Sequence, residues 1–457
     1  MEGPKREPYW LDRPERPEPL PCLTGDATCD LAVVGGGYTG LWTALLAKER
    51  HPGLDVLVLE QGSCGSAASG RNGGFCSPSL THGLANGAER WPREIAALQR
   101  LGAENFDALR RDLDRHGIDC DFRLAGKLSV ATTPWQAAAL RTTAKLAHRH
   151  GEEAVLLEGA HLRDHIDSPA WSTGLLQPRY GLLDPARLAW GLRAACLAAG
   201  VRIAEHTKVT HLDTRTDPLL RLTTPYGAVT ARRAALATNA YPPLLRRLGL
   251  RTIPVYDYAL TTEPLTDAQF KAVGWQGDHG ITDSGNQFHY LRKTADGRVL
   301  WGGYDAVYHY GSPVHDGLSR RDDSHRLLAE QFRETFPQLG EVRFSHAWGG
   351  AIDSSTRFTM FTGQAARGRV AYALGFTGLG VSATRFAAAT VLDLLDGLRT
   401  ERTELTMMRR PPVPFPPEPA RWLAVAATRR ALAHEDRTGH RTLWLRTLDR
   451  LGLGFDS

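Results

Sequence analysis

The chain has 457 residues, of which 42% are hydrophobic and 23% charged, as expected of a globular protein with two or three structural units. Its formal charge of +5, from 55 basic and 50 acidic side chains, is too small an excess to indicate a nucleic-acid partner. Six scattered cysteines without a C-x-x-C pair argue against a disulfide framework or a metal site, and the absence of a signal core or membrane-spanning stretch predicts a cytoplasmic protein.

The first elements are predicted from hydrophobic patterning. Residues 1–28 are rich in proline and charge, and we expect an arm along the surface, anchored by the apolar residues 9–11. Residues 29–34 form a nearly all-apolar run, typical of a strand buried on both faces. Apolar residues then recur at helical spacing over 38–50, and 54–59 repeat the buried-strand pattern. The sequence therefore predicts a βαβ unit with parallel strands.

The rest of the chain continues this mixed pattern. Periodicity and cap residues predict a helix over 184–199, strands over 201–204 and 232–239, short antiparallel strands between 253 and 303, and helices over 323–336 and 381–398. After a proline-rich linker come two basic amphipathic stretches, 421–433 and 440–452. We expect these stretches to dock on the protein's own surface or to form an oligomer contact, with an anionic membrane surface as the alternative.

A glycine motif joins the first strand to the first helix. Gly35-Gly-Gly37-Tyr-Thr-Gly40 matches G-x-G-x-x-G, and Glu60 ends the second strand 20 residues after Gly40. Gly35 permits a tight turn, Gly37 lets a pyrophosphate approach the helix N-terminus, and Gly40 lets helix and strand pack closely. Glu60 is suited to bind the hydroxyls of an adenosine ribose. The motif predicts a dinucleotide and leaves nicotinamide and flavin cofactors open.

A second glycine-rich loop, Ser66-Ala-Ala-Ser-Gly-Arg-Asn-Gly-Gly-Phe75, distinguishes the two cofactors. Its small residues let the chain lie along an extended cofactor, while Ser69, Arg71 and Asn72 offer hydrogen-bond donors to pyrophosphate and flavin-ring oxygens. A surface loop with incidental glycines is the alternative. The position of this loop close behind Glu60 favours a flavin.

These motifs, with His346-Ala-Trp-Gly-Gly-Ala-Ile-Asp353 and Gly375-Phe-Thr-Gly-Leu-Gly-Val381, resemble the FAD-dependent amine and D-amino-acid oxidase (DAO) family, in particular its γ-glutamylputrescine oxidase-like branch. The resemblance implies an α/β protein. A glutathione-reductase-type, Rossmann-like FAD-binding domain (29–120, 178–250 and 346–400) would be interleaved with a mainly antiparallel α+β substrate domain (121–177 and 251–345), followed by a helical tail (401–457). It also implies oxidation of an amine or amino acid to an imine, hydrolysis of the imine, and reoxidation by oxygen to hydrogen peroxide.

The same resemblance implies the positions that bind FAD. They are Gly35, Gly37, Tyr38, Thr39, Gly40, Glu60, Gln61, Ser69, Gly70, Arg71, Asn72, Gly73, Gly74, Val209, Thr238, Asn239, Gly349, Gly350, Gly375, Thr377, Gly378, Leu379 and Gly380. Because no cysteine follows Cys196, a flavin tether in the C-terminal part is unsupported and we expect non-covalent FAD.

Four residues are candidates for the substrate side. Tyr290 and Arg292 lie on one face of a predicted strand and could bind substrate. The equally weighted alternative is that both are ordinary strand residues without a role in binding. Trp348 could pack beside the flavin. His346 could accept a proton, although a structural histidine is at least as well supported.

One departure from the family bears on the substrate. Glycine-oxidase-like members carry an arginine for the substrate carboxylate after the equivalent of Trp348, where this chain has Ala351-Ile352-Asp353. The departure favours a primary or secondary amine, with a distant acidic group, over a small D-amino acid. An oxidase is favoured; a dehydrogenase or biosynthetic tailoring enzyme with another electron acceptor, and a non-catalytic flavin-binding protein, remain alternatives. A homo-oligomer is compatible with all three.

Overall fold

The predicted βαβ unit forms the centre of the first sheet. In the computed structural model, which describes residues 3–215 and 218–453, β1 (Ala27–Val34) pairs in parallel with β2 (Val56–Leu59), and α1 (Tyr38–Arg50) connects them. Every residue of β2 is buried because helices cover one face of the sheet and further strands and loops cover the other.

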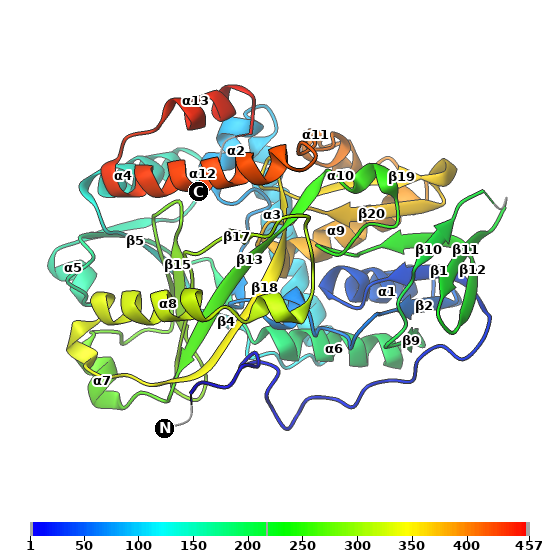
Figure 1. The fold of residues 1–457 in the computed structure, drawn as a ribbon, viewed down its shortest axis with the longest axis horizontal. Coiled ribbons are helices and arrows are strands. Elements are labelled where there is room, and N and C mark those ends of the chain that lie inside the picture. The colour runs from blue at the N-terminus through cyan, green and yellow to red at the C-terminus, as the bar shows by residue number, and fades with distance from the viewer. Residues whose placement is uncertain (1–2, 216–217, 454–457) are drawn as a thin grey trace.

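Eight strands make up this first sheet, in the order β10-β11-β12-β1-β2-β9, with β20 beside β12 and β19 beside β20. The added strands are β9 (Arg202–Ala204), β10 (His211–Asp213), β11 (Leu220–Thr224), β12 (Gly227–Leu236), β19 (Phe361–Ala365) and β20 (Val370–Leu374). Its central pairs are parallel. Helices α6 (Pro185–Ala198) and α9 (Gly380–Leu395) pack against α1 (Figure 1), which gives the predicted Rossmann-like layer.

A second sheet of nine strands has the order β17-β13-β16-β15-β14-β5-β7-β6, with β18 beside β13. Its strands are β5 (Lys127–Ala131), β6 (Val155–Glu158), β7 (Thr173–Gln177), β13 (Thr252–Thr262), β14 (Gly280–Asp283), β15 (His289–Lys293), β16 (Val299–Gly303), β17 (Val307–Tyr308) and β18 (Phe344–Ser355). Only β5 and β14 pair in parallel, so this sheet is mainly antiparallel, as predicted. Helix α8 (Asp322–Thr335) packs on one face.

Strand β18 lies in the second sheet, whereas the expected division assigned residues 346–400 to the FAD-binding domain. Strand β18 pairs with β13 from Thr252–Ser355 to Thr262–Phe344. Residues 344–355 therefore belong to the second sheet, and the chain returns to the first sheet only at β19. The sequence suggested otherwise because the glycines of β18 resemble those of a cofactor loop.

Smaller elements fill the space around the sheets. A three-stranded sheet consists of β3 (Phe75–Cys76), β8 (Gly181–Leu182) and β4 (Arg123–Leu124). The remaining helices are α2 (Leu84–Arg90), α3 (Ile95–Arg115), α4 (Pro134–Arg149), α5 (Ala160–Arg163), α7 (Asp267–Ala272), α10 (Glu401–Glu404) and α11 (Thr406–Arg409). Short 3-10 turns are η1 (Ala68–Gly70), η2 (Arg246–Leu248), η3 (Asp316–Ser319), η4 (Pro337–Leu339) and η5 (Ala366–Gly368).

Both ends of the chain dock on this body. In the arm, Tyr9, Trp10 and Leu11 are buried together with Leu300 and Trp348, as the prediction of an anchor required. In the tail, α12 (Ala420–Thr438) and α13 (Leu443–Arg450) lie across the upper edge in Figure 1. Within 3–215 and 218–453, no helix combines the length and the apolar character required to span a membrane.

Candidate active site

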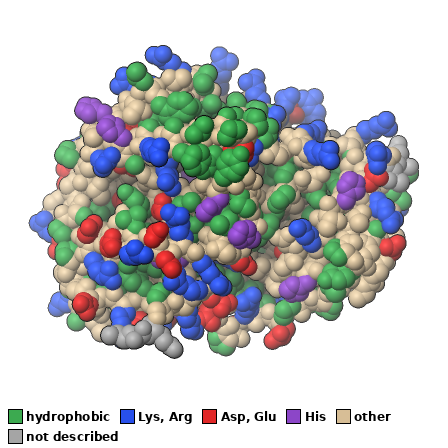
Figure 2. Space-filling view, viewed as in Figure 1, with side chains coloured by type: hydrophobic (Ala, Val, Ile, Leu, Met, Phe, Trp, Pro, Cys, Tyr) green, Lys and Arg blue, Asp and Glu red, His purple; other side chains and the backbone are tan. Residues whose placement is uncertain are grey.

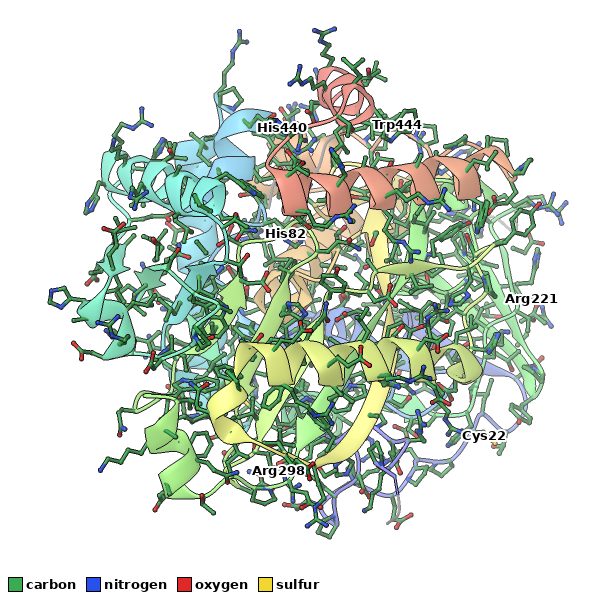
Figure 3. The ribbon with its side chains drawn as sticks, turned by 60° about the vertical axis from the view of Figure 1, so that its left-hand side comes forward. Cys22, His82, Arg221, Arg298, His440 and Trp444 are labelled. Carbon is green, nitrogen blue, oxygen red and sulfur yellow. The ribbon has the colours of Figure 1, made fainter. Side chains whose placement is uncertain are left out.

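A cavity of about 2100 Å³ lies between the two sheets and continues beneath the tail helices. Figure 3 shows His82, which lines the cavity, below the tail segments that carry His440 and Trp444. Most of the predicted site residues line it: Gly35, Gly37, Tyr38, Thr39, Glu60, Gln61, Ser69, Arg71, Asn72, Gly73, Val209, Thr238, Asn239, Tyr290, Trp348, Gly349, Gly350, Thr377, Gly378, Leu379 and Gly380. Six others lie behind this lining: Gly40, Gly70, Gly74, Gly375, Arg292 and His346.

The first glycine loop has the geometry that its motif predicts. Gly35 has φ +113°, and a Cβ there would lie 2.4 Å from the carbonyl oxygen of Ala237. A Cβ on Gly40 would lie only 1.8 Å from the carbonyl oxygen of Gly35, so helix and loop can meet only at a glycine. Gly37 is the N-cap of α1 and has no side chain to cover the helix end, which faces the cavity.

Glu60 is held at the end of β2 by backbone donors. The N–H groups of Gly36 and Gly62 donate to its two carboxylate oxygens at 2.6 and 2.7 Å. Burial raises the pKa of Glu60, while these two hydrogen bonds act in the opposite direction. The carboxylate is thus fixed beside the first glycine loop, with Gln61 and Val209 also on the cavity wall.

The polar side chains of the second glycine-rich loop form hydrogen bonds mainly with other protein groups. Ser69 Oγ accepts the N–H of Tyr38 at 3.0 Å, and the Asn72 side chain bonds the backbone of residues 68, 69 and 74. The Arg71 guanidinium reaches η3 of the second unit, donating to Ser319 Oγ at 3.2 Å and pairing with Asp316 at 2.9 Å. Arg71 therefore links the two units while also lining the cavity, and its expected role as a donor to pyrophosphate or flavin-ring oxygens stays a prediction.

The loop before α9 depends on a buried carboxylate. Asp353, near the end of β18, accepts the N–H groups of Gly375 and Phe376 at 2.5 and 3.1 Å, and the correctly oriented Asn239 amide donates to it at 2.9 Å. Burial raises the pKa of Asp353 to about 7. Thr377 follows with φ +50°, and α9 begins without a side-chain cap, so its N-terminus opens onto the cavity.

The second sheet supplies the opposite wall. Strand register aligns Ser129, Thr282, Tyr290, Gly302, Ala259 and Trp348 in one row across β5, β14, β15, β16, β13 and β18. Residues in one such row point to the same face. Gly73 accommodates the Tyr290 ring, since a Cβ at Gly73 would lie 2.8 Å from it. Trp348 Nε1 donates to the carbonyl oxygen of Arg71 at 2.9 Å, which joins this wall to the second loop.

Asp257 of β13 is a cavity residue that sequence reasoning missed. Its Oδ2 accepts the hydroxyl of Tyr290 at 2.8 Å, and its Oδ1 accepts the N–H of Tyr258 at 2.9 Å. Burial raises the pKa of Asp257 to about 6, although the bond from Tyr290 lowers it. Asp257 lies opposite Gly350 in the sheet, and a Cβ at Gly350 would lie 3.8 Å from the Arg71 side chain.

Arg292 and His346 are placed elsewhere, one row further along the strands. Arg292 is fully buried, donates to the carbonyl oxygen of Leu183 at 2.6 Å, and lies over the ring of Trp10. His346 is held under the arm, 3.0 Å from a carboxylate oxygen of Asp12. Neither side chain lines the cavity, because the arm and the small sheet cover this end of the second sheet. The structure therefore does not bring them to the predicted substrate side.

Lys127 also lines the cavity and was not predicted. Its ammonium lies 5.3 Å from the ring centroid of Tyr180, and burial lowers its pKa to about 8. Among residues 3–215 and 218–453, no carboxylate forms an ion pair with it. A lysine in such a place lacks the counter-ion that a buried cation usually has.

The cavity fits an extended dinucleotide. Two helix N-termini face it: that of α9 has no side-chain cap, and at that of α1 Ser69 accepts the N–H of Tyr38. A Cβ at Gly378 would meet open space.

Comparison with known proteins decides the family. Residues 30–394 match the DAO family, described as FAD-dependent oxidoreductases. The chain belongs to this family. Its cofactor is FAD. Over 419 residues, this DAO-family protein is 32% identical to gamma-glutamylputrescine oxidoreductase of Escherichia coli (strain K12), covering 89% of this chain and 92% of the relative.

Solved structures share the fold of this DAO-family chain. Glycine oxidase from Geobacillus kaustophilus superposes with a TM-score of 0.69 at 20% identity, over 84% of this chain and 99% of that one. L-proline dehydrogenase from P. horikoshii gives a TM-score of 0.68 at 17% identity, over 83% and 96%. Since an oxidase and a dehydrogenase share the fold, the fold does not distinguish the two activities.

Proposed function

We propose that the protein oxidises a primary or secondary amine that carries a distant anionic group, releasing a carbonyl product after hydrolysis of the imine. The C–H bond next to nitrogen breaks, the nitrogen loses a proton, and one electron pair leaves the substrate. When bound, FAD supplies the acceptor for that pair. Molecular oxygen is proposed as the second substrate, taking up the two electrons to give hydrogen peroxide.

The observation that carries this proposal is the Asp257–Tyr290 pair on the cavity wall. An alkylamine is protonated at neutral pH, and it must lose that proton before its carbon can be oxidised. A carboxylate whose pKa is about 6 is ionised at pH 7 and can bind the ammonium or accept its proton. The Tyr290 hydroxyl stabilises the ionised form by donating to Oδ2.

The position of Lys127 on the cavity wall is the reason for proposing an anionic group on the substrate. In the sheet, Lys127 of β5 lies four strands from Asp257 of β13 and is offset from it by about four residues along the strands, so their backbones are roughly 20–25 Å apart. A substrate that binds both groups would therefore carry its carboxylate at the far end of a long chain. The E. coli relative is named for gamma-glutamylputrescine, a molecule with this combination of groups, which adds to the proposal.

The test is anaerobic reduction of the purified yellow protein. We expect an amine with a distant carboxylate to bleach the flavin absorbance, and the same amine with that carboxylate amidated to require a higher concentration. A colourless protein, or a flavin that no amine bleaches, would reject the amine chemistry.

Admitting air to the bleached protein tests the electron acceptor. Rapid return of the absorbance with release of hydrogen peroxide is expected of an oxidase. Slow return in air, with fast return on adding an artificial electron acceptor, would replace the oxygen proposal by a dehydrogenase.

A further inference from the structure

The tail helices have two faces of different character. Their inner face lines the cavity through Leu432, Trp444 and Leu448. Asp436 fixes α12 to the second unit by accepting the N–H groups of Asn286 and Gln287 at 2.7 and 2.9 Å. The tail is thus docked, as predicted, and its other face remains open to solvent.

This open face exposes large apolar side chains. Leu443 is 81% exposed, Leu451 62% and Leu423 58%, and Trp422 is also exposed. Leu443, Arg446 and Arg450 recur at helical spacing on one side of α13, away from the cavity-lining Trp444 and Leu448. Figure 2 shows hydrophobic side chains gathered at the upper edge, where Figure 1 draws α12 and α13, with basic side chains beside them. A patch of this kind on a docked tail indicates an interaction surface.

The charges on this face have one sign. Among residues 420–453, all of which the structure describes, the exposed charged side chains are arginines: Arg430, Arg437, Arg446 and Arg450, together with Arg429, which lines the cavity and pairs with Asp305 at 3.5 Å. The acids of the tail are used internally. Glu435 and Asp449 both pair with Arg441, at 2.8 and 2.6 Å, and Asp436 holds the 286–287 loop.

We propose that this tail face binds the surface of an anionic phospholipid bilayer, with Trp422 and the leucines in the headgroup region and the arginines on the lipid phosphates. Arginines around exposed tryptophan and leucine are the side-chain pattern of helices that lie in a membrane interface. A two-fold contact with a second copy would instead place the same arginines against one another. Docking in this orientation sets the outer end of the cavity, lined by Trp444 and Leu448, next to the lipid.

The experiment is sedimentation of the full-length holoprotein with vesicles. We expect at least about tenfold more binding to phosphatidylcholine vesicles containing phosphatidylglycerol than to phosphatidylcholine alone, and less binding as salt rises. Equal binding to the two compositions, or none to either, would overturn the proposal.

Two tail variants separate the apolar and the basic contributions. L443S/L451S leaves the charge unchanged, and R446E/R450E reverses two charges that have no ion-pair partner among the described residues. Each should lose most of the vesicle binding while retaining flavin and the circular dichroism of the parent. Retained binding in L443S/L451S would refute insertion.

Matched controls and an oligomer test complete the design. R111E/R163E changes exposed arginines on α3 and α5, away from the tail, and should bind vesicles as the parent does. An equal loss in this control would mean general charge attraction and would overturn the tail assignment. If light scattering shows a lipid-independent dimer that L443S/L451S dissociates, the face is an interface between copies and the proposal fails.

Discussion

Replacing Asp257 by asparagine tests the centre of the proposed site. The half-buried carboxyl lines the cavity, and loss of solvation raises its pKa from 3.8 to about 6. In the folded protein the ionised form is therefore disfavoured, and the loss of stability develops as pH rises from about 4 to about 6. Two pKa units correspond to about 3 kcal/mol. Asp257→Asn removes this pH-dependent penalty, so its stability should decline less than the parent's between pH 4 and pH 7.

The same substitution should alter catalysis in a distinctive way. In the parent, the rate constant for anaerobic flavin reduction at low amine concentration should rise as pH increases through about 6, where the Asp257 carboxylate forms. In Asp257→Asn this rise of the rate constant near pH 6, the acidic limb of the pH profile, should vanish. The rate constant should fall by about 10²- to 10⁴-fold, the usual contribution of a proton acceptor. Stopped-flow absorbance at the flavin band measures both effects.

Tyr290→Phe distinguishes a proton-accepting pair from a merely structural one. The Tyr290 hydroxyl lowers the pKa of Asp257, so its removal should move the limb to higher pH, by about one unit for the loss of one hydrogen bond to a charged group. A limb near pH 6 that persists in Asp257→Asn, or that moves to lower pH in Tyr290→Phe, would refute the assignment.

Three further substitutions test other parts of the site. Gly40→Ala places a Cβ 1.8 Å from a loop carbonyl and should abolish FAD retention on gel filtration, whereas Gly53→Ala, with open space around it, should not. Lys127→Met should raise KM for an amine with a distant carboxylate by about 10- to 100-fold, the value of a hydrogen bond to a charged group, with little change in kcat. His346→Gln should leave the pH profile of flavin reduction unchanged, because the ring lies under the arm; a lost limb would return it to the site.

The cofactor side could be predicted because its signals are local. A tight turn, a close helix–strand contact and a ribose acid fall within 26 residues, from Gly35 to Glu60, and each constrains the residue type at its own position. The structure bears out that reasoning for Gly35 and Gly40. Where the reasoning extended to side-chain partners, as for Arg71, it did not anticipate the second unit, because η3 is more than 240 residues away in the chain.

The substrate side depends on register between distant strands. Alternation along β15 placed Tyr290 and Arg292 on one face, and they do share it. It could not show that the arm covers only the end that carries Arg292. Asp257 and Lys127 come from strands whose partners are far along the chain, so no local pattern marks them. The cavity wall formed by the second sheet becomes recognisable only when the pairing of all its strands is known.

Asp353 shows how one departure from the family pattern gains a physical explanation. The sequence has an aspartate in the segment where glycine-oxidase-like members carry an arginine. Its carboxylate accepts hydrogen bonds from the backbone N–H groups of residues 375 and 376 and from the side-chain amide of Asn239. With its pKa raised to about 7, this group is only partly ionised at neutral pH, and its hydrogen bonds offset much of the penalty of burial. The Asp353 carboxylate thus holds the loop before α9. Asp257, one strand away on β13, accepts the Tyr290 hydroxyl on the cavity wall and is the acid that we propose for the amine.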